Sequence, residues 1–242
     1  MKLTSTKTNL KYINCLIYGR YGIGKTPLAA TAPKPIIIDT EGGTLSISDL
    51  DLPMLEVRSI EELDEAYDFI KGKKGNDFES VVIDSGSELA EIILSDFKKE
   101  HRDPRKAYGE MGEELVKVLR KFKDLKKNLI VTAKAKIITL NGYERYRASF
   151  PGPALTEAVP YLFDEVFCLR FSNDDDNEGK DEDNFKILQA KPDEDYDAKD
   201  RSRKLKFAEK PDLAYIFEKI LSGQPQEEKK KKKKKKKKST EE

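Results

Sequence analysis

The sequence predicts an α/β fold, with a mostly parallel, doubly wound sheet and a C-terminal antiparallel extension. Short apolar runs rich in β-branched residues alternate with segments of helical periodicity. These runs are continuously apolar, which is typical of strands buried on both faces of a parallel sheet joined by right-handed crossovers. After the fifth run the alternation stops, and an acidic stretch separates it from another strand-like run.

The expected strands of the parallel part are residues 13–18 (INCLIY), 35–39 (PIIID), 80–84 (SVVID), 128–133 (NLIVTA) and 165–171 (EVFCLRF). Helical spacing predicts helices at 26–31, 60–71, 87–99 and 110–127. The acidic stretch 172–184 is expected to be a turn that leads to an antiparallel strand, FKILQA, and the fold is expected to end with a helix at 211–221.

The 242 residues fit one domain and a tail: a core at 1–222 and a disordered lysine-rich tail at 223–242. Ten of the 46 basic residues form the run 229–238, and without it and the two terminal glutamates 36 basic and 43 acidic residues remain. The body is therefore mildly acidic. The run would bind any polyanion without sequence preference, contact an acidic protein, or contribute little.

Cysteine content and hydropathy favour a cytoplasmic protein. Cys15 and Cys168 each lie in an apolar run, so both are expected to be buried and reduced. No apolar run approaches the roughly 18 residues of a membrane span, and no membrane partner is expected.

The first expected strand leads into a phosphate-binding sequence, Gly19-x4-Gly24-Lys25-Thr26, with a further glycine at Gly22. It fits the Walker A pattern, or P-loop, in which backbone N–H groups wrap phosphates and glycines avoid obstructing Cβ atoms. Lys25 is expected to reach the β and γ phosphates, and Thr26 to hold Mg²⁺. The pattern predicts binding of ATP and Mg²⁺.

A P-loop site also needs an acidic residue at the end of a neighbouring strand to position Mg²⁺. Asp84, which ends SVVID, is favoured over Asp39, which ends PIIID, because Asp39 is followed by Glu41, a candidate for another role. A strand-end cap is the alternative for either aspartate.

The position of this glutamate carries a resemblance. Glu41 follows the second strand in IIIDTEGG, whereas Ser85 follows the aspartate in VVIDSGSE. Together with PGPALTEAVPYLFDEVFCL and LQAKPDEDYDAKDRS, this pattern over residues 12–221 resembles the phage-encoded RecA-like P-loop ATPases, a family of nucleotide-binding or single-strand-annealing recombination proteins. The resemblance implies a RecA-like core and a host-cell cytoplasmic location.

The resemblance also implies roles for individual residues. Glu41 would be the general base that polarises the attacking water, or else a solvated turn residue. Lys199 and Arg201 would reach a neighbouring subunit's nucleotide, which makes hydrolysis dependent on assembly, or would belong to a charged surface loop.

A second DNA-binding loop is implied at 134–152, where Lys134 replaces the family's usual polar amide. An Asn141-Gly142 turn predicts a β-hairpin there, and cations interleaved with aromatic rings are typical of single-strand sites. The candidate DNA-binding residues are Lys134, Lys136, Tyr143, Arg145, Tyr146 and Arg147. An ordinary exposed hairpin is the alternative. A first such loop is expected near 100–112, with His101 as a surface residue.

The sequence is therefore interpreted as an ATP-binding phage recombination protein that binds single-stranded DNA and promotes annealing or strand pairing. It is expected to be a weak ATPase that works as a homo-oligomer, a ring or filament, with a single-strand-binding protein as a possible partner. The alternatives are a DNA-stimulated P-loop motor or loader ATPase, and a small-molecule kinase in which Lys25 and Arg201 clamp phosphates.

Overall fold

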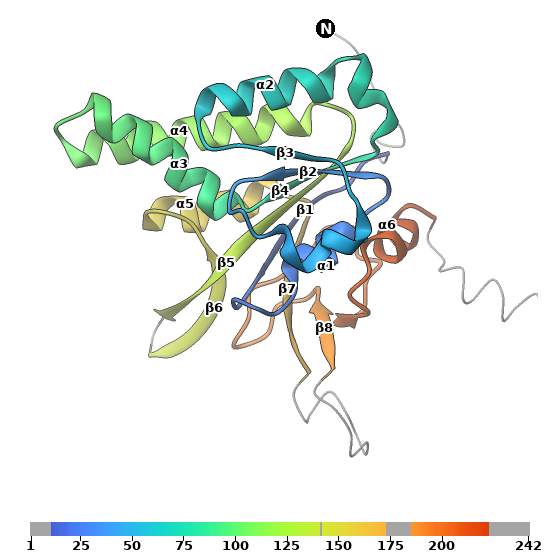
Figure 1. The fold of residues 1–242 in the computed structure, drawn as a ribbon. Helices are drawn as coiled ribbons and strands as arrows, with labels where there is room; N and C mark the ends of the chain where they lie inside the picture. The colour runs from blue at the N-terminus through green and yellow to red at the C-terminus, as the bar shows by residue number, and fades with distance from the viewer. Residues whose placement is uncertain (1–10, 141, 173–184, 223–242) are drawn as a thin grey trace, which may run out of the picture.

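The computed structural model describes residues 11–140, 142–172 and 185–222 (Figure 1). The elements of its first half are β1 (Asn14–Gly19), α1 (Lys25–Ala30), β2 (Pro35–Asp39), the 3-10 helix η2 (Thr44–Leu50), β3 (Met54–Glu56), α2 (Ile60–Lys71), η3 (Lys73–Asp77), β4 (Ser80–Asp84), α3 (Gly86–Glu100) and α4 (Pro104–Lys123). They are followed by β5 (Asn128–Leu140), β6 (Tyr143–Ser149), α5 (Pro153–Ala158), η4 (Val159–Leu162), β7 (Glu165–Phe171), β8 (Lys186–Gln189), β9 (Lys199–Asp200), β10 (Ala208–Glu209) and α6 (Leu213–Ser222).

One sheet organises the described residues, in the order β10-β8-β7-β1-β5-β4-β2-β3. The neighbours from β7 to β3 are parallel. By contrast, β7 pairs with β8, and β8 with β10, in antiparallel fashion. The predicted α/β fold, with a mostly parallel sheet and an antiparallel C-terminal part, is confirmed.

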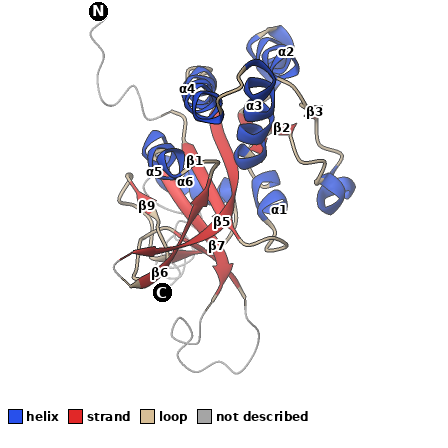
Figure 2. Ribbon diagram, turned by 90° about the vertical axis from the view of Figure 1, so that its left-hand side faces the viewer, coloured by secondary structure: helices blue, strands red, loops and turns tan. Residues whose placement is uncertain are grey.

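Helices cover both faces of this sheet (Figure 2). One apolar cluster joins it to α2, α3 and α4, with Phe122 and Leu115 buried. The other joins it to α1 and α6, with Leu28 and Phe217 buried. The sheet is thus buried on both faces, which explains why its central strands are continuously apolar.

The thiols lie in these two clusters. Cys15 and Cys168 are buried and free, as expected, and burial raises the pKa of Cys168 to about 12.

One expected loop is a helix instead. α4 begins at Pro104, whereas the sequence analysis placed a helix start at residue 110. The side chain of Asp103 accepts a hydrogen bond from the backbone N–H of Arg105, and proline suits the first helical turn, so residues 104–112 are helical. The expected first DNA-binding loop near 100–112 was therefore wrong. His101 accordingly sits at the end of α3, where it contacts Glu110.

The hairpin at 134–152 is confirmed. β5 continues without a break to Leu140 and pairs antiparallel with β6. The turn residue Asn141, the acidic turn at 173–184 and the tail at 223–242 lie outside the described residues. Within the described part of the chain, no helix is both long enough and apolar enough to cross a membrane.

Candidate nucleotide-binding site

The segment between β1 and α1 lies at the carboxyl ends of the parallel strands and lines a cleft of about 930 Å³. Residues from η2, β4, β5, β6 and β8 and from the turn after β2 complete the wall of this cleft. In open α/β sheets this edge is the usual place for ligands. The fold therefore brings the P-loop together with residues that are distant in the sequence.

The glycines of the P-loop are required by its backbone. Gly22 and Gly24 have φ angles of +71° and +101°, a region that other residues rarely adopt. Gly19 is constrained by packing, because an added Cβ would lie 2.6 Å from the carbonyl oxygen of Leu169. The loop can hold this shape only with glycine at these positions.

Lys25 is folded back onto its own loop. Its Nζ donates hydrogen bonds to the carbonyl oxygens of Gly19 and Arg20, each at 3.1 Å. Burial lowers the pKa of Lys25, while the nearby carboxylates of Glu41 and Asp84 act in the opposite direction. Its two acceptors are neutral, so a phosphate would be a stronger partner for this ammonium group.

Asp84 and Thr26 meet at the base of the cleft. Thr26 Oγ1 donates to Asp84 Oδ2 at 2.6 Å, and Thr132 Oγ1 donates to Asp84 Oδ1. Asp84 is only 5% exposed. A hydroxyl and a carboxylate are oxygen ligands of the kind that Mg²⁺ prefers, so the residues present fit this ion.

Asp39, the less favoured candidate for the metal site, has a structural role. Its carboxylate accepts the backbone N–H groups of Glu41 and Gly42, at 3.2 and 2.8 Å, and is paired with Arg58 at 3.3 Å. It therefore caps the turn that presents Glu41.

Glu41 extends from this turn to the end of the neighbouring strand. Its Oε1 accepts a hydrogen bond from Ser85 Oγ, directly after Asp84, and its side chain lines the cleft. Thr40 and Ser85 join the same two segments, because Thr40 Oγ1 accepts from Ser85 N at 2.8 Å. The Asp84–Ser85 peptide bond is cis. The candidate base thus lies beside the candidate metal ligands.

Three lysines outside the P-loop also line the cleft, namely Lys134, Lys136 and Lys186. Lys134 is opposite Gly19 in the sheet and pairs with Glu88 at 2.7 Å, and this hydrogen bond raises the pKa of Lys134. Lys186, on β8, was missed by the sequence analysis. A single lysine after an acidic stretch gives no signal of its own, because only the sheet pairing brings it to the P-loop.

The hairpin separates the candidate DNA-binding residues onto two faces. Lys136 is opposite Arg147 in the β5–β6 register, whereas Tyr146 is opposite Ile137 and so lies on the other face. Tyr146 stacks on Tyr196, with ring centroids 4.9 Å apart.

The hairpin arginines already have partners. Arg145 pairs with Asp197 at 3.0 Å, and Arg147 pairs with the same carboxylate. Lys136 and Tyr143 are exposed, the latter by 73%. The six residues therefore form no single uninterrupted surface.

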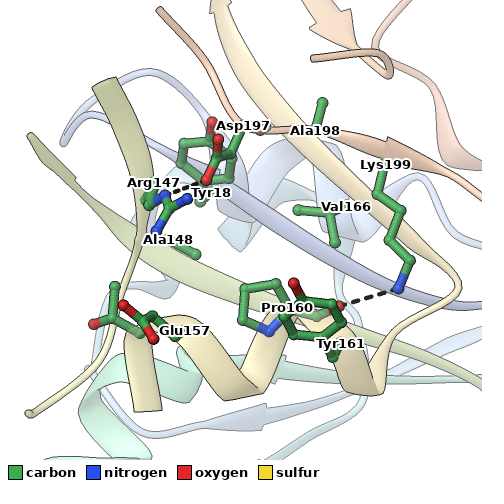
Figure 3. Close-up of a pocket in the computed structure, with 11 residues that line it drawn as sticks. Tyr18, Arg147, Ala148, Glu157, Pro160, Tyr161, Val166, Asp197, Ala198 and Lys199 are labelled. Carbon is green, nitrogen blue, oxygen red and sulfur yellow. Dashed lines mark hydrogen bonds and ion pairs between the residues drawn. The ribbon is translucent and has the colours of Figure 1, made fainter. Parts of the chain in front are cut away.

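Lys199 and Arg201 lie near the amino-terminal end of β7, away from the carboxyl ends of the strands where the P-loop lies, because β9 pairs with the first residues of β7. Lys199 Nζ donates to the carbonyl oxygen of Phe163 at 2.7 Å and points toward Pro160 in a pocket of about 510 Å³ (Figure 3). Burial lowers the pKa of Lys199. Arg201 pairs with Asp164 at 2.7 Å. The structure thus does not bring this pair to the chain's own P-loop.

Comparison with known proteins gives one family. A family model described as an AAA domain matches residues 11–202. Among solved structures, a KaiC-like protein from the archaeon Pyrococcus horikoshii aligns with a TM-score of 0.45 and 14% identity, over 73% of this chain and 77% of that chain. The RadB recombinase aligns with a TM-score of 0.44 and 16% identity, over 73% and 79%. No curated protein matches the sequence.

Proposed function

The chain belongs to the AAA-domain family of P-loop NTPases and has an α/β fold of the RecA-like type, and from this premise we propose that it binds and slowly hydrolyses ATP with Mg²⁺. The observation that carries the proposal is the meeting of four groups in one cleft. They are the ammonium of Lys25, the hydroxyl of Thr26, the carboxylate of Asp84 to which that hydroxyl is hydrogen-bonded, and the carboxylate of Glu41.

Each group has a chemical task. Lys25 would exchange its two carbonyl partners for phosphate oxygens, and Thr26 and Asp84 would hold Mg²⁺ directly or through water. The ion would neutralise charge on the phosphates. Glu41 would orient and polarise the attacking water, as a carboxylate near the γ-phosphate can. The hydroxyl of Ser85 would keep that carboxylate in place.

We further propose that the protein binds single-stranded DNA and promotes annealing or strand pairing as a homo-oligomer. In this proposal the exposed Lys136 and Tyr143 contact the strand, because the two hairpin arginines are already paired. Lys199 and Arg201 would act on a neighbouring subunit's nucleotide, and their distance from the chain's own cleft agrees with action in trans. A phage origin, a host-cell cytoplasmic location and a single-strand-binding partner belong to the same proposal.

The test combines nucleotide and DNA measurements on the full chain with lysines 229–238 replaced by serine, which removes the non-specific polyanion site. We expect slow Mg²⁺-dependent ATP hydrolysis that Glu41→Gln abolishes without loss of ATP binding. ATP should strengthen binding to a labelled single strand, measured by fluorescence anisotropy, and the double variant Lys136→Ala, Tyr143→Ala should weaken it.

Other outcomes would redirect the proposal. Strong stimulation of hydrolysis by DNA together with directional movement would favour a motor or loader ATPase. Phosphate transfer to a metabolite without DNA would favour a kinase. Failure of the protein to bind ATP would refute the nucleotide site itself.

A further inference from the structure

The cleft contains a cation that lies outside the P-loop motif. Lys186, the first residue of β8, lines the same cleft as Lys25 and Thr26. A Cβ added to Gly24 would lie 3.2 Å from Lys186 Nζ. The ammonium group is therefore beside the last glycine of the phosphate-binding loop.

Strand geometry explains why this side chain points toward the loop. Side chains two residues apart on a strand lie on the same face of the sheet, so Lys186 shares a face with Leu188. Leu188 is fully buried in the cluster that contains Leu28 and Ala29 of α1. In addition, Lys186 is opposite Phe171 in the β7–β8 pairing, which fixes its backbone. The sheet therefore directs Lys186 to the face that carries the P-loop and α1.

The basic residues that line the cleft outnumber the acidic ones, so the cleft favours binding of an anion. Its basic lining residues are Arg20, Lys25, Lys134, Lys136 and Lys186. Its acidic lining residues are Glu41 and Asp84. Among the described residues, no carboxylate forms an ion pair with Lys186, whereas Lys134 is paired with Glu88. Like charges gathered in one cleft repel one another, and a polyphosphate between them would turn repulsion into attraction.

We propose that Lys186 is a second phosphate-binding lysine of the nucleotide site, supplied by the antiparallel β7–β8 pair instead of the P-loop. This inference rests on the proposed ATP-binding function and adds a residue to that site. Lys186 contacts phosphate oxygens as a point charge on a flexible stem. Bound nucleotide consequently joins the first β–α unit of the sheet to its C-terminal extension.

The test compares nucleotide affinities of full-length wild type, Lys186→Ala, Lys186→Arg and Lys191→Ala. Lys191 is a matched control, because it is an exposed lysine two residues beyond β8 and does not line the cleft. Isothermal titration calorimetry with ATP, ADP and adenosine separates phosphate contacts from contacts with the base or ribose. Circular dichroism and thermal melting check that each variant is folded.

We expect Lys186→Ala to weaken ATP binding about fivefold, in the range of an exposed charge pair, and to leave adenosine binding unchanged. Lys186→Arg should restore most of the affinity, Lys191→Ala should match wild type, and added salt should narrow the difference. If Lys186→Ala binds ATP as wild type does, or if adenosine weakens equally, the role in phosphate binding is refuted. If wild type itself does not bind ATP, the proposed function fails instead.

Discussion

The stability of the protein should depend on pH through Glu165, the first residue of β7. This carboxyl is only 2% exposed, and its buried Oε2 has no hydrogen-bond partner among the residues that the structure describes. Burial, with a smaller contribution from the charge of Asp200, raises the pKa of Glu165 from 4.5 to about 8. At neutral pH the folded protein therefore keeps this group protonated, whereas the unfolded chain ionises it.

The sign and size of the effect follow from linkage. Between pH 4.5 and 8 unfolding releases a proton from Glu165, so its contribution is fully favourable below this window and is lost as the pH rises through it. At about 1.4 kcal/mol for each pH unit, the full loss is at most about 5 kcal/mol. Water access and relaxation around the ionised group should reduce it to roughly 2–3 kcal/mol.

Glu165→Gln removes the ionisation and keeps the shape of the side chain. Urea unfolding at pH 5, 7 and 8.5 should show a difference from wild type that is small at pH 5 and grows to roughly 2–3 kcal/mol in favour of the variant at pH 8.5. Glu157→Gln, at an exposed position of α5, removes a charge that is not buried and serves as the control. A difference that stays constant from pH 5 to 8.5 would refute the reasoning.

Three further predictions concern the nucleotide-binding site and a buried ion pair. Gly19→Ala places a Cβ 2.6 Å from a backbone oxygen, so the free energy of unfolding should fall by about 1–3 kcal/mol in thermal melting, and ATP binding should weaken. Unchanged stability would contradict the packing argument. Asp84→Asn should abolish the Mg²⁺ dependence of ATP binding in calorimetry, and a retained dependence would move the metal site elsewhere. Lys219→Ala leaves the carboxylate of Glu209 buried, and denaturant unfolding should show a loss of about 3–5 kcal/mol, whereas a loss below 1 kcal/mol would mean that water reaches the pair.

The features that the sequence predicts well are those that depend on residues close together in the chain. The runs PIIID, SVVID and EVFCLRF coincide with β2, β4 and β7, because a strand buried on both faces must be apolar throughout. The start of α4 was missed because its first turn is charged, although Asp103-Pro104 is a recognisable capping signal. Within the candidate site, the P-loop is one continuous segment and could therefore be predicted from the sequence.

The remaining features depend on pairing between distant segments. The acidic turn predicts that β8 pairs with β7, but nothing in the sequence near Lys186 indicates that this pair lies beside the P-loop, and nothing near Arg147 indicates that Asp197 will neutralise it. From the charge pattern of the sequence alone, the hairpin arginines are expected to be free to bind DNA. The fold instead packs them against an acidic segment that comes about 50 residues later.

This neutralisation changes where the molecule can attract anions. One carboxylate, Asp197, serves both Arg145 and Arg147, and the surrounding PDEDYD segment supplies further acidic groups. In the cleft, by contrast, basic lining residues outnumber acidic ones, and only Lys134 among them is paired with a carboxylate of the described residues. The cleft should therefore attract phosphate, and this attraction extends along β5 from Lys134 to Lys136. In the proposed DNA-binding mode, a strand contacting Lys136 would pass beside the nucleotide, whose negative charge would repel it, so the expected strengthening of DNA binding by ATP would have to come from assembly of subunits and not from direct attraction.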